Sequence, residues 1–263
     1  MRADVYLVAQ GVAKSRTLAQ KLILSGSVRI DGQAVTKPSE DIPDGEHSLS
    51  VTAIDEMRYV SRGGLKLEAA LSAFGVDVRG LVMADIGAST GGFTHCLLTK
   101  EAARVYAVDA GHGQLDASLA RNPSVRSMEG INARYLSPEH LVAFEKQVSE
   151  VCLRPDGTPF SGVVDGVVMD VSFISQTMIH PSLAKILRPN GFLLTLIKPQ
   201  FEVGASGLGK HGVVKDPKHR DEAVERVCLS AAACGFERQG IMPSPIQGGD
   251  GNVEYIGYFL KKN

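Results

Sequence analysis

Strand-length apolar runs alternate with helical segments from residue 59 onward, and this pattern constrains the fold more than any other feature of the chain. The runs cover residues 81–86, 104–108, 163–171, 191–197 and 253–260. Runs that are apolar at successive positions are typical of parallel strands whose two faces are both covered by helices. The pattern therefore predicts an α/β fold. Polar residues at its strand ends are candidates for ligand contact, because ligands bind beyond the carboxyl ends of such strands.

The first 58 residues have a different pattern. Residues 2–37 hold six Lys or Arg against two acids, and residues 40–56 hold six acids and no Lys or Arg. Two short helical segments end at Gly11 and Gly26, with Ser15 as the N-cap of the second, and Asp31-Gly32 forms a hairpin turn between two short strands. The sequence thus predicts a small basic α+β domain at residues 1–58, including a linker from residue 53, before a larger domain at residues 59–263.

Charge and cysteine usage limit the possible partners. Lys plus Arg is 28 and Asp plus Glu is 29, so any nucleic-acid surface must be a local patch. The four cysteines form no C-x-x-C pair and the histidines lack ligand spacing, so no metal site is expected. No run approaches the ~18 apolar residues of a membrane span, and the start lacks a signal-peptide pattern. We expect a cytoplasmic protein without a membrane as its primary partner, and the sequence indicates no oligomeric state.

A glycine-rich loop follows the apolar run at residues 81–86 and reads ADIGASTGGF at residues 84–93. A dinucleotide-binding loop reads G-x-G-x-x-G and presents a helix N-terminus to a pyrophosphate. Here Asp85 stands just before the first glycine. A carboxylate disfavours a pyrophosphate but suits S-adenosylmethionine, which carries an ammonium and a sulfonium. The loop therefore favours S-adenosylmethionine over NAD, although a glycine-rich loop alone could be a tight structural turn.

The expected cofactor contacts extend to the next strand ends. Asp109 follows the run at 104–108, where a carboxylate usually binds ribose hydroxyls. Asn132 could face the adenine or could be an ordinary turn residue. The candidate contacts up to this point are Asp85, Gly87, Ser89, Gly91, Gly92, Phe93, Asp109 and Asn132.

Four further residues are candidates for chemistry. Asp170 and Lys198 each close a buried apolar strand, where a charged side chain must be paired or lose its charge. Lys66 lies on the helix before the first strand, and Glu254 lies at the start of the last one. Lys66 could instead be a solvated helix lysine, and Glu254 could be an edge charge.

These residues carry a resemblance to a known family. Lys66, Asp170, Lys198 and Glu254 resemble the Lys-Asp-Lys-Glu tetrad of FtsJ-like ribose 2'-O-methyltransferases. The segments at residues 59–67, 85–94, 170–175 and 197–202 resemble the TlyA family, whose members are often labelled haemolysins, and residues 15–38 resemble the alpha-L RNA-binding motif. The resemblance implies a Rossmann-like class I methyltransferase with a mostly parallel seven-stranded sheet, behind an N-terminal RNA-binding domain.

The resemblance also implies an activity, which is methyl transfer from S-adenosylmethionine to the 2'-hydroxyl of a ribosomal RNA nucleotide, a cytidine. Lys198 would stand next to this hydroxyl, either as a base that accepts its proton or as a charge that stabilises a developing alkoxide. Asp170 would orient Lys198 and lie near the methyl donor, so it is also a candidate cofactor contact. Glu254 would hold Lys66 or the substrate ribose.

The implied partner is ribosomal RNA or a ribosomal subunit. The basic residues expected to bind RNA phosphates are Arg2, Lys14, Arg16 and Lys37. The segment at residues 201–214 is rich in glycine and basic residues. It could close over RNA or could be an ordinary flexible loop.

Two other functions remain open at this point. The family label suggests a membrane-active, haemolysin-like protein, but this would require amphipathic barrel strands or a surface-seeking helix, and neither stands out. The chain could also be a non-catalytic RNA-binding protein built on a methyltransferase fold, and the complete tetrad argues against that alternative.

Overall fold

The computed structural model divides the chain into two compact units, Met1–Tyr59 and Val60–Asn263. It describes residues 1–13, 15–52, 58–149, 152–204, 207–248 and 251–263. The candidate RNA contact Lys14 and the linker at residues 53–57 lie outside the described residues.

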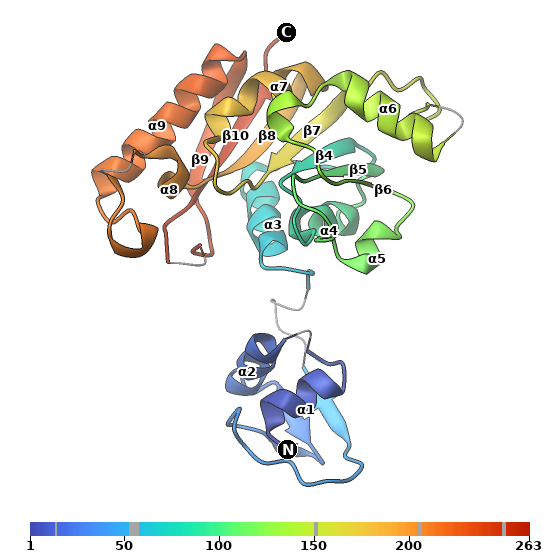
Figure 1. The fold of residues 1–263 in the computed structure, drawn as a ribbon, viewed down its shortest axis with the longest axis vertical. Coiled ribbons are helices and arrows are strands. Elements are labelled where there is room, and N and C mark those ends of the chain that lie inside the picture. Colours follow the sequence, from blue (N-terminus) through green and yellow to red (C-terminus); the bar gives the residue numbers. More distant parts are fainter. Residues whose placement is uncertain (14, 53–57, 150–151, 205–206, 249–250) are drawn as a thin grey trace. The chain divides into compact units, whose positions relative to one another are not determined.

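The N-terminal unit packs two helices beside a small antiparallel sheet (Figure 1). Its elements are α1 Ala3–Ala9, α2 Arg16–Leu24, β1 Val28–Ile30, β2 Gln33–Ala34 and β3 Leu49–Val51. Ser15 caps α2 as predicted, because its Oγ accepts a hydrogen bond from the backbone N–H of Leu18 at 3.3 Å. The predicted hairpin pairs β1 with β2, and β3, which the sequence reading did not identify, pairs with the other side of β1.

A seven-stranded sheet forms the centre of the second unit, in the order β6-β5-β4-β7-β8-β10-β9. Its strands are β4 Val82–Ile86, β5 Arg104–Val108, β6 Val125–Met128, β7 Val164–Met169, β8 Leu187–Ile197, β9 Phe236–Pro243 and β10 Tyr255–Lys261. Strands β6, β5, β4, β7 and β8 are parallel, whereas β10 is antiparallel to both β8 and β9. The prediction of a mostly parallel seven-stranded sheet is confirmed.

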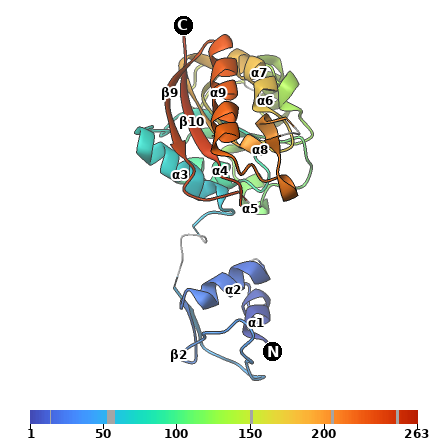
Figure 2. The same ribbon diagram turned by 90° about the vertical axis from the view of Figure 1, so that its left-hand side faces the viewer.

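Helices cover both faces of this sheet (Figure 2). Tyr258 of β10 contacts Phe74 of α3, with ring centroids 5.3 Å apart, while the next residue, Phe259, joins the core cluster that includes Cys228 and Ala231 of α9. Because successive side chains of a strand point to opposite faces, α3 and α9 lie on opposite sides. The helices of this unit are α3 Gly63–Phe74, α4 Gly92–Thr99, α5 Ala117–Ala120, α6 Pro138–Val148, α7 His180–Ile186, α8 Pro199–Glu202 and α9 Pro217–Ala233, and the short 3₁₀ turns are Ala133–Tyr135, Gln176–Met178 and Lys210–Gly212.

The predicted strand limits differ from those in the structure at two functionally important strand ends. The run at 163–171 forms a strand only to Met169, so Asp170 follows β7 directly, with its N–H donating to the carbonyl of Ile86 at 2.9 Å. Glu254 lies one residue before β10. Because β10 runs antiparallel to β8 with Tyr255 opposite Ile197, the start of β10 reaches the sheet edge where Lys198 follows β8.

Candidate active site

Glycines let the loop after β4 pack closely against its neighbours. Gly87 has φ +82°, and a Cβ built there would lie 2.5 Å from the carbonyl oxygen of Asp170. A Cβ on Gly92 would collide with Ser61 Oγ, just before α3. Any side chain at these two positions would therefore separate the loop from the end of β7 and from α3, which carries Lys66.

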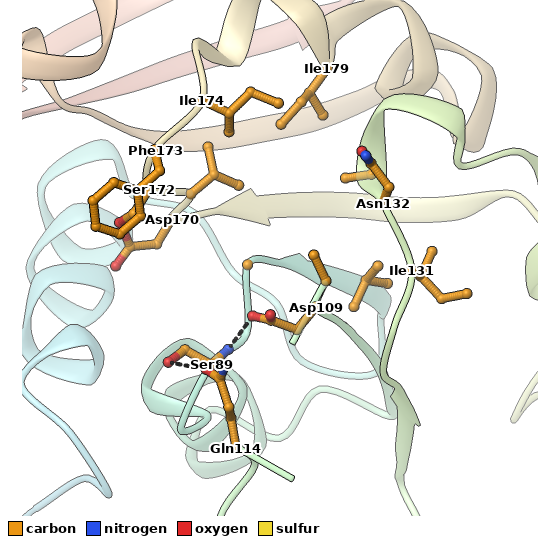
Figure 3. A pocket seen from close by; sticks show the side chains of 15 residues that line it. Ser89, Asp109, Gln114, Ile131, Asn132, Asp170, Ser172, Phe173, Ile174 and Ile179 are labelled. Carbon is orange, nitrogen blue, oxygen red and sulfur yellow. Dashed lines mark hydrogen bonds between the residues drawn. The ribbon is translucent and has the colours of Figure 1, made fainter. Parts of the chain in front are cut away.

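A cavity of about 470 Å³ opens beside this loop at the carboxyl edge of the sheet. Figure 3 shows Asp109 and Asn132 on one side of it and Asp170 and Phe173 on another. Its volume falls in the range of sites for cofactor-sized ligands. Apolar side chains line part of its wall, namely Val108, Ile131, Val171, Ile174 and Ile179.

Asp109 is held in position by the backbone of two loops. Its Oδ2 accepts from the N–H of Ser89 at 2.8 Å and its Oδ1 accepts from the N–H of Gly111 at 2.7 Å, while Ser89 Oγ donates to Gln114 Oε1 at 3.1 Å (Figure 3). Asn132 lines the cavity as well, and its side chain caps the turn at residues 133–135 by accepting from the N–H of Arg134. Both residues line the cavity, and their expected contacts with a ribose and an adenine stay predictions.

Asp85 lies beneath the loop rather than in the cavity. It is fully buried, its Oδ2 accepts from Thr94 Oγ1 at 2.6 Å, and its Oδ1 has no hydrogen-bond partner. Burial, with a smaller contribution from the nearby charges of Asp170 and Asp109, raises the pKa of Asp85 to about 7. Asp85 is therefore a buried carboxyl group under the loop whose charged form is disfavoured, and it is not among the residues that line the cavity.

The charges around the cavity suit a ligand that carries positive charge. Its described lining includes the carboxylates Asp109 and Asp170 and contains no lysine or arginine. A cationic group bound there would offset the repulsion among Asp85, Asp109 and Asp170, which adds to the effect of burial on the pKa of Asp85. A pyrophosphate would add to that repulsion. The residues that line the cavity therefore fit S-adenosylmethionine better than a dinucleotide.

Two lysine–carboxylate pairs stand next to this cavity. Lys66 Nζ donates to Glu254 Oε2 at 2.5 Å, and both side chains are buried. Lys198 Nζ lies 2.6 Å from Asp170 Oδ1 and donates to Ser172 Oγ at 2.8 Å. The structure thus gathers all four predicted tetrad residues at one edge of the sheet.

Three of these four residues line a second cavity, of about 270 Å³. It is lined by Lys66, Asp170 and Lys198, and by the loop residues Gly87, Ser89, Gly92 and Phe93. Asp170 lines both this cavity and the larger one, so it stands between the expected cofactor position and Lys198. A third cavity adjoins the same group of residues, and its lining includes Lys198, Glu254, Phe173 and Phe201.

The predicted cofactor contacts fall into two groups. Gly87, Ser89, Gly92, Phe93, Asp109, Asn132 and Asp170 line the first or the second cavity. Asp85 and Gly91 are not among the lining residues; a Cβ on Gly91 would collide with Leu119, so this glycine serves the packing of α5 against the loop. Asp85 and Gly91 therefore shape the site from behind.

Sequence reasoning missed two residues of the site. Ser172 accepts a hydrogen bond from Lys198 Nζ. Phe173 is 93% exposed, adopts φ +63°, and lies with its ring centroid 5.3 Å from that of Phe201. A phenylalanine in this conformation is strained, and such strain is concentrated at functional sites. The one sequence signal that could have indicated Ser172 and Phe173 as site residues is their place in the motif at residues 170–175.

In the N-terminal unit, two predicted RNA contacts share one buried carboxylate. Asp4 is fully buried and accepts hydrogen bonds from Arg2 and Arg16 at 3.0 Å and from Gln20 at 2.9 Å. The hydrogen bond from Arg2, followed by that from Gln20, holds the pKa of Asp4 well below its usual range. The N–H of Asp4 also donates to Pro38, which brings the exposed residue Lys37 to the same region.

The chain matches known proteins over nearly its whole length. Residues 59–261 match the FtsJ-like methyltransferase model, and residues 1–47 match the S4 domain. The chain is 42% identical over 255 residues to 16S/23S rRNA (cytidine-2'-O)-methyltransferase TlyA of Mycobacterium tuberculosis, covering 97% of this chain and 88% of the relative. It is 38% identical over 260 residues to Hemolysin A of Brachyspira hyodysenteriae, covering 99% and 100%. A solved structure of a hemolysin-named protein from Streptococcus thermophilus matches with a TM-score of 0.72 at 39% identity, covering 100% of this chain and 89% of that one.

Proposed function

Since the chain belongs to the FtsJ-like methyltransferase family, we propose that it transfers the methyl group of S-adenosylmethionine to the 2'-hydroxyl of a cytidine in ribosomal RNA. One observation carries this proposal. The pairs Lys198–Asp170 and Lys66–Glu254 stand together beside a cavity whose lining suits a cationic cofactor. We assign methyl transfer to residues 59–263 and RNA binding to residues 1–58.

For this reaction the protein must mainly position the acceptor hydroxyl and accept or stabilise its proton and charge. Bound S-adenosylmethionine supplies an activated methyl group, so in-line positioning of the acceptor provides much of the acceleration. Lys198 Nζ stands where it can accept the proton of the 2'-hydroxyl or stabilise the oxygen as negative charge develops. Asp170 fixes Lys198 by its ion pair, and Lys66 is held next to the same cavity by Glu254.

Two features support an RNA substrate. Phe173 offers an exposed aromatic ring at the catalytic pairs, and enzymes that act on nucleotides commonly stack an unpaired base on such a ring. The S4 match covers the unit in which Arg2, Arg16 and Lys37 lie, and these cations suit RNA phosphates.

Among the described helices, none is both long and apolar enough to cross a membrane.

Replacing Asp109 by asparagine should weaken S-adenosylmethionine binding by roughly 10- to 100-fold, as expected for losing a hydrogen bond to a charged group. The amide would keep one acceptor for the two loop N–H groups but would present a donor where the ribose hydroxyls need a carboxylate. Isothermal titration calorimetry would measure the Kd. Asp77→Asn, at an exposed turn, is the control, and an Asp109 variant that binds as tightly as this control would remove Asp109 from the cofactor site.

The proposed function is tested by transfer of tritiated methyl groups from S-adenosylmethionine to free ribosomal subunits and intact ribosomes. Label should enter rRNA, and digestion to nucleosides should place it on the ribose of cytidine. Label on a base, or on another nucleoside, would contradict the proposed acceptor. Absence of label from every particle, with cofactor binding demonstrated, would contradict the activity itself. Leakage assays on liposomes test the membrane-active alternative, which the haemolysin naming of two relatives suggests.

A further inference from the structure

A buried glutamate connects the two loops that carry Asp170 and Lys198. Glu202, at the end of α8, is 3% exposed. Its Oε2 accepts from Ser175 Oγ at 2.5 Å and its Oε1 accepts from the N–H of Gln176 at 2.9 Å. Ser175 is five residues after Asp170, and Glu202 is four residues after Lys198, so this carboxylate joins the segments that deliver both members of the ion pair.

The connection extends into the sheet through Gln176. Thr195 of β8 donates its hydroxyl proton to Gln176 Oε1 at 2.7 Å, and Gln176 Nε2 donates to the carbonyl of Leu196 at 3.4 Å. On the other side, an Arg226 guanidinium N–H donates to the backbone carbonyl of Glu202 at 2.6 Å, which ties α8 to α9. The loop after β7 is therefore anchored to β8 and α8 through a buried polar network centred on Glu202.

The protein keeps this carboxylate in an environment that disfavours its charge. Burial raises the pKa of Glu202, and the hydrogen bonds from Ser175 and Gln176 offset that effect only in part. Since the folded pKa is raised, the ionised group reduces folding stability as the pH rises above the ordinary glutamate value. A group that costs stability is consistent with a role in the active site, because function can require local features that reduce stability.

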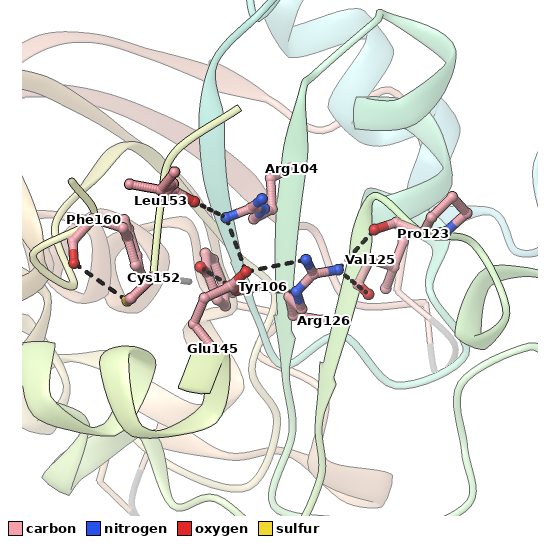
Figure 4. Close-up of polar contacts among 9 residues, drawn as sticks. All are labelled: Arg104, Tyr106, Pro123, Val125, Arg126, Glu145, Cys152, Leu153 and Phe160. Atoms are coloured by element: carbon pink, nitrogen blue, oxygen red, sulfur yellow. Dashed lines mark hydrogen bonds and ion pairs between the residues drawn. The ribbon is translucent and has the colours of Figure 1, made fainter. Parts of the chain in front are cut away.

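A second buried glutamate provides a contrast (Figure 4). Glu145 of α6 is 1% exposed and accepts from Tyr106 at 2.9 Å and from Arg126 at 3.0 Å, and it pairs with Arg104 at 3.1 Å. Burial acts to raise its pKa, but the hydrogen bonds from Arg126 and Tyr106 and the arginine charges outweigh burial, and the pKa is lowered. Arg104 begins β5, so this cluster lies toward the amino edge of the sheet, away from Lys198.

We propose that Glu202 is a positioning residue that fixes the distance between Lys198 and the Asp170–Ser172 segment by holding the loop after β7 against α8. The inference rests on the proposed methyl transfer. It adds the carboxylate of Glu202 to the four tetrad residues, and this carboxylate acts without contacting substrate or cofactor. Small displacements of reacting groups can reduce a rate by about 100-fold. Glu202 acts through the orientation of Lys198, and the cofactor contacts at Asp109 and Asn132 do not depend on it.

The test compares Glu202→Ala, Glu202→Gln and the matched buried control Glu145→Gln in the full-length protein. Glu202→Ala should lower kcat for methyl transfer by about 100-fold and Glu202→Gln by about tenfold, since the amide still accepts from Gln176. The Kd for S-adenosylmethionine and the KM for ribosomal particles should change less than twofold. Glu145→Gln should lower the melting temperature with kcat unchanged.

Hydrogen–deuterium exchange gives a readout that does not depend on activity. Exchange in residues 171–176 should rise in both Glu202 variants and stay at the wild-type level in Glu145→Gln. A folded Glu202 variant with wild-type kcat and unchanged exchange would overturn the inference, and if the alanine variant does not fold, the glutamine variant decides. If the wild-type protein transfers no methyl group, the proposed function fails, and unchanged exchange alone would then refute the positioning role.

Discussion

Replacing Lys198 by alanine should lower kcat for methyl transfer by roughly 100- to 10,000-fold, the range expected for removing a positioned proton acceptor or donor. Lys198 is the cation that contacts both Asp170 and Ser172. Cofactor binding should persist within about twofold, because Lys198 does not line the cavity that holds Asp109 and Asn132. Tritium incorporation and calorimetry on the same preparation measure the two quantities.

Two further substitutions sharpen this result. Lys100→Ala removes a lysine that is paired with Glu68 at 3.2 Å and precedes β5, so its activity should equal that of the wild type. Lys198→Arg keeps the charge but offers a group that stays protonated. If Lys198 accepts the proton, arginine should be as inactive as alanine; substantial activity with arginine would instead assign Lys198 the electrostatic role. Loss of cofactor binding in Lys198→Ala would contradict the assignment of Lys198 to the acceptor side.

Replacing Glu254 by alanine should destabilise the protein by about 3–5 kcal/mol, the usual cost of stranding one partner of a buried ion pair. Lys66 would then keep its charge in a buried position without its 2.5 Å partner. Chemical denaturation followed by circular dichroism measures the free energy of unfolding. Methyl transfer should also be lost.

A double variant separates the loss of stability from the loss of function. Lys66→Met with Glu254→Leu removes both charges and replaces them with apolar groups of similar size, so stability should return to within about 1–2 kcal/mol of the wild type. Activity should remain absent, because the second cavity would lack Lys66. An active double variant would show that the pair only supports the fold, and an unaltered stability in Glu254→Ala would show that the pair is not buried in solution.

The sequence predicted the sheet because its signals are local. Continuous apolar runs identified β4, β5, β7, β8 and β10 within a few residues of their limits. The antiparallel direction of β10 was not predicted, since a run of apolar residues has no direction. Strand β9 was missed because its residues are mostly exposed or half-buried and lack the apolar run that marks the inner strands. Glu237, Arg238 and Gln239 interrupt it with three polar side chains.

Site residues were predictable to the extent that strand ends determine position. Asp109, Asp170 and Lys198 each follow a parallel strand, so the sheet brings them to one edge whatever the loops do. Asp85 shows the limit of this argument. It lies one residue before the end of β4, where side chains alternate between faces, and its carboxylate points to Thr94 rather than to the cavity. Glu202 was unpredictable because its partners depend on how two loops fold together.

The pair Lys66–Glu254 joins positions 188 residues apart, whereas the residues that line the cavity proposed to bind the cofactor all fall between positions 87 and 179. Contacts between distant positions cost more loop-closure entropy and form later in folding than contacts within one stretch of chain. A refolding molecule should therefore recover cofactor binding before it recovers turnover. The delay between the recovery of cofactor binding and the recovery of turnover would measure how long β10 takes to pair with β8, the step that completes the sheet.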